Sequence, residues 1–139
     1  MLNEAQARHL TTTLRMTEER LLQLRQRLRG EVSSRTLLLC DNDVSDAERV
    51  AVTRRIDEAL QLIADLSQQW KLAARSQSLR QTLIGTLSVT WADLQDAKAQ
   101  ALRRYGETDP RLGGTLDPPI DHIADILLAI CRTVGENGK

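Results

Sequence analysis

Aromatic side chains are nearly absent from this chain. Its 139 residues include no Phe, one Tyr and two Trp, although 41% of the residues are apolar. Aliphatic side chains must therefore fill the interior, which suits closely packed helices better than a β-sandwich. The scarcity of aromatic rings also leaves few side chains that could stack on nucleobases.

Paired cysteines, a leader sequence and long apolar runs are missing as well. Cys40 and Cys131 lie far apart and form no CxxC motif, which is typical of reduced thiols in a cytoplasmic protein. The residues after Met1 do not follow the charged and then apolar pattern of a secretory signal. The longest strongly apolar run, Ile126–Cys131, is far shorter than the roughly 20 residues of a membrane span. The sequence thus predicts a cytoplasmic protein without a membrane partner.

The chain also lacks a net charge, because its 19 Lys and Arg residues balance its 19 Asp and Glu residues. A protein that depends on phosphate contacts usually carries a basic excess. The charge balance therefore disfavours nucleic acid as a partner.

What the chain does contain is a series of apolar residues at helical spacing, which is clearest between residues 46 and 74. Apolar residues recur there at alternating steps of four and three, which keeps them on one face of a helix. Ser45 and Glu48 form a capping-box pattern that marks the start of this helix. The members of this apolar stripe are Val52, Ile56, Ala59, Ile63, Leu66 and Trp70.

Three further segments have a similar rhythm, and the sequence predicts helices over residues 3–29, 78–105 and 118–134. Asn3 and Ser78 are suitable N-caps for two of them, and Asp117 before two prolines suits the third. The connections 31–44 and 106–117 are predicted to be irregular, with Leu37–Leu39 packed across one end. The predicted fold is a single all-α domain over residues 1–139, an antiparallel up-down-up-down four-helix bundle. One continuous helix from residue 46 to residue 105 is the alternative.

No catalytic, cofactor or metal site is predicted on the apolar stripes. They carry no carboxylate, and the chain has no Glu-x-x-His pair of the kind that holds two metals in a bundle. His9 and His122 lie off the stripes and are predicted to be exposed. Two acidic clusters, at 41–48 and 121–125, leave a metal-dependent enzyme on surface carboxylates as the second functional alternative.

The fourth predicted helix is the most apolar, with a greasy arc of roughly 200° that three bundle neighbours need not cover. Its candidate interface residues are Ile126, Leu127, Leu128 and Cys131. We therefore expect a homodimer, or a complex with another helical protein, and a non-catalytic adaptor or regulatory role. The first alternative is association with nucleic acid through a basic face at the end of the first helix, formed by Arg20, Arg25, Arg27 and Arg29.

Overall fold

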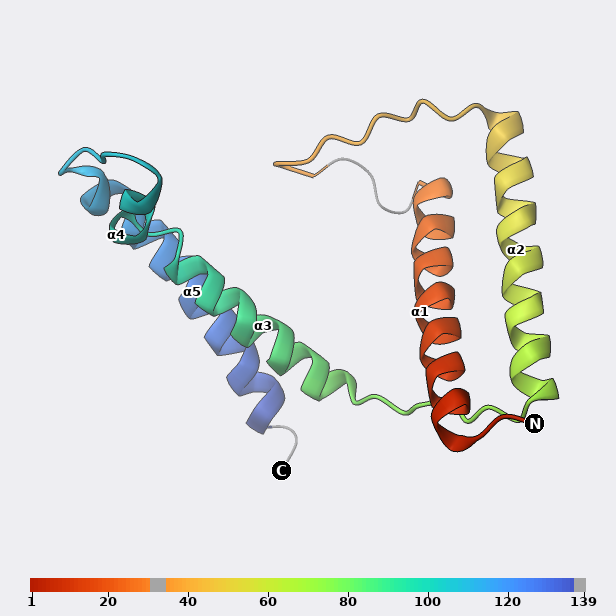
Figure 1. Ribbon diagram of the computed structural model, residues 1–139. Helices are drawn as coiled ribbons and strands as arrows, with labels where there is room; N and C mark the ends of the chain where they lie inside the picture. The colour runs from red at the N-terminus through yellow and green to blue at the C-terminus, as the bar shows by residue number, and fades with distance from the viewer. Residues whose placement is uncertain (31–34, 137–139) are drawn as a thin grey trace. The chain divides into compact units, whose positions relative to one another are not determined.

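The computed structural model describes residues 1–30 and 35–136 (Figure 1). Within these ranges the chain forms helices, turns and loops but no strand, so the predicted all-α class is confirmed. The helices are α1 (Glu4–Leu28), α2 (Asp46–Gln69), α3 (Leu79–Gln95), α4 (Ala99–Leu102), the 3-10 helix η1 (Arg103–Tyr105) and α5 (Leu112–Glu136).

The chain divides into two compact units, residues 1–74 and residues 75–139. In the first unit α1 packs against α2, and in the second unit α5 packs against α3 and α4 (Figure 1). A single domain in which all four long helices form one bundle stays a prediction.

Strong local signals define both ends of α1 and the start of α2. Asn3 and Gln6 form a reciprocal capping box before α1, and Ser45 and Glu48 form the predicted one before α2. Gly30, with φ 76°, follows the end of α1, where a left-handed conformation suits glycine. The predicted boundaries of the first helix and the predicted start of the second are therefore confirmed to within a residue or two.

The α1–α2 pair is antiparallel and has a narrow interior. Arg25, in the last turn of α1, forms a 2.8 Å ion pair with Asp57, in the first half of α2. Ile56 and Ile63 are buried, which confirms the centre of the predicted stripe. Its other large members, Val52, Leu66 and Trp70, are 37–44% exposed. One neighbouring helix covers only part of an amphipathic face, so the rest of the stripe stays open in this unit.

Helix α2 ends earlier than predicted, at Gln69 and not at residue 74. Lys71 has φ 52°, and its N–H donates to the carbonyl of Gln68, while the N–H of Leu72 donates to the carbonyl of Ser67. These two bonds form a Schellman motif. The motif normally has glycine at this left-handed position. Because lysine occupies it here, no glycine marks the end of α2 in the sequence. Residues 70–78 are not helical, and the alternative of one helix from 46 to 105 is therefore wrong.

The α3–α5 pair is also antiparallel. The Arg80 guanidinium, at the start of α3, donates to the carbonyl of Val134, near the end of α5. Ala99 and Ala124 are the buried apolar residues of this unit. Larger apolar side chains of the same unit, among them Leu87, Trp91 and Leu127, are half-buried.

Two predicted boundaries are wrong in the second unit. The predicted helix over residues 78–105 stops at Gln95 and resumes as α4 and η1. The predicted helix over residues 118–134 already begins at Leu112, so Pro118 and Pro119 lie inside α5. A proline inside a helix costs about 3 kcal/mol. For this reason the two prolines were predicted to lie in the first turn of the helix.

Asp117 has a different role from the predicted one. It was expected to cap its own helix, but its Oδ1 accepts a 2.9 Å hydrogen bond from the N–H of Ala99. Lys98, the N-cap residue of α4, makes no capping bond with its own side chain. A carboxylate 18 residues further along the chain thus caps α4.

Candidate functional site

The apolar arc of α5 is only partly covered by its own unit. Ala124 is 2% exposed, whereas Ile123, Ile126 and Ile130 are 49%, 50% and 39% exposed. At about 100° per residue, these three isoleucines lie within roughly 60° of one another on the helix. We call Ile123, Ile126 and Ile130 the α5 stripe.

The other predicted interface residues lie on the covered side of this arc. Leu127, Leu128 and Cys131 are half-buried. By helical spacing they lie on the same side as Ala124, about 40° to 140° round from Ile123. Of the four predicted interface residues, Ile126 is therefore the one that projects most into solvent, and Ile123 and Ile130 join it there.

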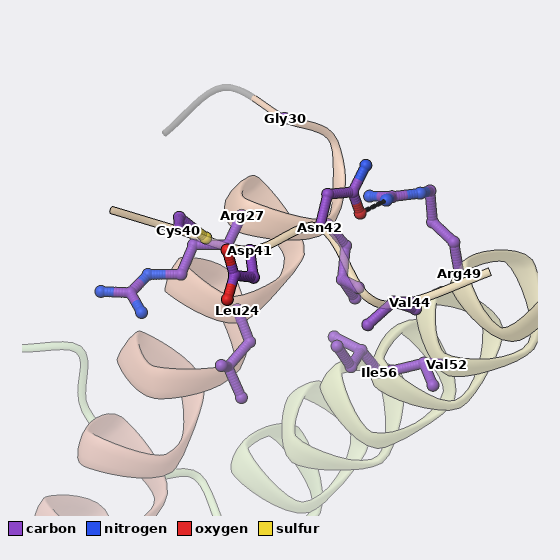
Figure 2. Close-up of a pocket in the computed structure, with 11 residues that line it drawn as sticks. Leu24, Arg27, Gly30, Cys40, Asp41, Asn42, Val44, Arg49, Val52 and Ile56 are labelled. Carbon is purple, nitrogen blue, oxygen red and sulfur yellow. Dashed lines mark hydrogen bonds between the residues drawn. The ribbon is translucent and has the colours of Figure 1, made fainter. Parts of the chain in front are cut away.

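A second candidate site is a hollow between α1 and α2, which we call the α1–α2 pocket (Figure 2). Its volume is about 360 Å³, within the usual range of ligand pockets. Leu24 and Leu28 of α1 face Val52 and Ile56 of α2 across it, and the loop residues 40–44 form a further wall. Sequence periodicity missed this site because an irregular loop makes one of its walls.

Polar groups surround the mouth of the α1–α2 pocket. Arg27, Asp41, Asn42 and Arg49 line it together with the aliphatic residues. The Arg49 Nη2 donates to Asn42 Oδ1 at 2.6 Å, which ties the loop to α2 (Figure 2). At the start of α2, hydrogen bonds from the backbone N–H and the hydroxyl of Ser45 lower the pKa of the Glu48 carboxyl.

Three exposed leucines, Leu37, Leu38 and Leu39, directly precede the loop residues 40–44. We call these three residues the leucine tip. They are 97%, 56% and 78% exposed. The N–H of Arg35 donates to the carbonyl of Leu38 at 2.8 Å, so the chain turns back on itself here. The predicted packing of Leu37–Leu39 is therefore wrong for the first unit. A run of exposed leucines is unusual on a surface that faces only water.

The predicted basic face does not form as one surface. Arg20, Arg27 and Arg29 are exposed, but Arg25 is only 26% exposed at its side chain and pairs with Asp57. Arg25 lies about 140° round the helix from Arg20, whereas Arg27 shares the side of Arg20. Association with nucleic acid stays a prediction without a specific structural observation in its favour.

The acidic cluster of α5 takes part in a structural ion pair. Asp121 Oδ1 lies 2.8 Å from Lys98 Nζ. The hydrogen bond to Asp121 is the main cause that raises the pKa of Lys98. His9 and His122 are exposed, as predicted. Within residues 1–30 and 35–136, no three His, Cys, Asp or Glu side chains gather where they could hold a metal ion.

Comparisons of the chain with protein-family models, curated proteins and solved structures gave no match. In the part of the chain that the structure describes, every helix is too short or too polar to cross a bilayer. The candidate surfaces of this protein are the α5 stripe, the α1–α2 pocket and the leucine tip.

Proposed function

We propose that this protein is a non-catalytic helical module that self-associates and acts as an adaptor or regulator. The α5 stripe pairs with the same stripe of a second copy. The observation that carries the proposal is the row of three half-exposed isoleucines beside the buried Ala124. Such a row on an otherwise amphipathic helix is typical of a helix that packs against more than one neighbour.

Pairing through the α5 stripe brings two α3–α5 pairs together. Four helices from two copies then surround one apolar interior, with helices crossing at shallow angles of about 20°. The competing arrangement is a bundle of α1, α2, α3 and α5 within one chain. That arrangement covers the α5 stripe without a second copy.

The expected affinity is modest. Burying the remaining half of an isoleucine contributes about 1 kcal/mol, so six side chains from two copies contribute about 6 kcal/mol. Association costs about 4–15 kcal/mol in lost freedom of motion. The two terms are of similar size, so the α5 stripe alone supports only weak pairing. We expect a dimer that dissociates on dilution.

Ile126→Asp tests the proposal directly. A charge in the centre of the α5 stripe should prevent pairing through α5 and so weaken self-association, while helix content and melting temperature change little, because Ile126 is already exposed. The matched control is Ala129→Asp, which adds the same charge at an exposed position of α5 off the stripe. Equal loss of association in both variants, or in neither, would contradict the proposed role of the stripe.

A further inference from the structure

We propose that the leucine tip of one copy inserts into the α1–α2 pocket of a second copy, and that the exchange is reciprocal. This contact adds a second surface to the proposed self-association. It lies in the first unit and does not require the α5 stripe.

The tip and the pocket complement each other in polarity. Leu37 and Leu39 expose 97% and 78% of their surface, and the pocket presents Leu24, Val52 and Ile56 as an aliphatic lining. The volume of about 360 Å³ is large enough to receive side chains of this size. Insertion removes apolar surface from water on both partners, which favours association.

Their positions allow a symmetric exchange. The tip leads directly into residues 40–44, which form one wall of the pocket (Figure 2). Tip and pocket therefore belong to one surface of the first unit. A two-fold symmetric dimer needs such a self-complementary surface, because the same residues of both copies then form the two equivalent contacts.

Charge on this surface is also self-complementary. Asp41, Asp43 and Asp46 follow the tip, and Arg27 and Arg49 line the pocket together with Asp41. Arg29 and Arg54 line an adjoining hollow between the same two helices. In a reciprocal pair the acidic turn of each copy approaches Arg27 and Arg49 of the other, which favours this register over contacts between like charges.

The test uses two complementary variants, both made in the Ile126→Asp background so that the α5 stripe does not contribute. One variant, Leu37→Asp with Leu39→Asp, has a defective tip and an intact pocket. The other, Val52→Trp, fills the pocket and leaves the tip intact. Association of mass-tagged chains is followed by native mass spectrometry, and circular dichroism checks that helix content is kept. Leu62→Asp, at another exposed position of α2 that does not line the pocket, is the control.

We expect the background protein and the Leu62→Asp control to dimerise alike, and each test variant alone to dimerise at least about tenfold more weakly. A mixture of the two test variants should form a heterodimer more tightly than either forms a homodimer, because one intact tip meets one intact pocket. The inference is overturned if the mixture gains nothing, if the test variants dimerise like the control, or if the background protein stays monomeric. The α5 proposal fails by a different result. The Ile126→Asp variant would then self-associate with the same affinity as the natural protein.

Discussion

The two helix pairs of this protein are held together in different ways. In the α1–α2 pair, neighbouring residues fix most helix ends, through the capping boxes at Asn3 and Ser45. In the α3–α5 pair, the start of α4 depends on Asp117, which is 18 residues away in the sequence. Helices with local signals can be located from the sequence, whereas helices that borrow a cap from a distant residue cannot.

The interiors differ in the same two units. Ile56 and Ile63 are buried in the first unit, whereas Ala99 and Ala124 are buried in the second. The first interior is therefore sensitive to loss of apolar volume or to a buried charge. The second is sensitive to added volume, because a packed interior leaves little free space beside a buried alanine.

The largest expected effect comes from a charge at a buried isoleucine of the α1–α2 pair. Ile63→Asp places an unpaired carboxylate at a position that is 8% exposed, and should abolish folding of the α1–α2 pair or cost it at least about 3 kcal/mol. Gln61→Asp, exposed on the opposite side of α2, should cost well under about 1 kcal/mol. Thermal melts followed by circular dichroism compare them, and equal losses would show that the wrong face of α2 was assigned to the interior.

A larger side chain at the buried position of Ala124 should destabilise the second unit. Ala124→Leu should destabilise the α3–α5 pair by about 1–3 kcal/mol, because Ala124 is 2% exposed and a larger side chain must push α5 away from its neighbours. Ala129→Leu, on the exposed side of the same helix, is the matched control and should be nearly neutral. Denaturant unfolding measures both, and tolerance of Ala124→Leu would argue against a close approach of α3 and α5.

Removing the distant cap should have an intermediate effect. Asp117→Ala leaves the Ala99 N–H without its acceptor and should cost about 1 kcal/mol. Amide hydrogen exchange should accelerate at Ala99 while the amides of α1 keep their protection. Asp117→Asn, which retains an acceptor oxygen, should restore most of that protection, and equal exchange in the alanine variant and the natural protein would contradict the capping role.

The end of α2 offers a change in the opposite direction. Lys71→Gly should stabilise the first unit by up to about 1 kcal/mol, because glycine adopts φ 52° without the steric cost that lysine bears. Lys71→Ala keeps the Cβ and should give no such gain. Denaturant midpoints compare the variants, and a loss of stability on Lys71→Gly would mean that the Schellman motif does not form.

The smallest effect concerns pH and the capping box of α2. The folded-state pKa of Glu48 is lowered by its hydrogen bonds to Ser45. The stability that Glu48 contributes is thus fully present above its unfolded-state pKa and is lost as pH falls through the lowered folded-state value. Glu48→Gln keeps the capping geometry but removes this titration. The melting temperature of the natural protein should therefore fall more steeply in acid than that of the variant, and parallel curves would contradict the assignment.

How far the sequence predicts the structure depends on where each signal lies. Periodicity and capping predicted α1 and the start of α2, because each signal and its consequence lie within a few residues. The stop at Lys71 carried no glycine, and the prolines of α5 imitated a helix start, so those boundaries were wrong. Of the candidate surfaces, Ile126 followed from helical spacing. The α1–α2 pocket did not, because only tertiary packing brings residues 40–44 against α1 and α2.

The central claim, that the protein self-associates through apolar surfaces left open on its helix pairs, is tested most directly by its mass in solution. Light scattering over a dilution series from hundreds of micromolar to below one micromolar measures it. The account predicts a mass that rises with concentration from the 15.6 kDa of one chain to at least twice that value. A constant 15.6 kDa across the series would contradict it and would favour burial of the α5 stripe within a single chain.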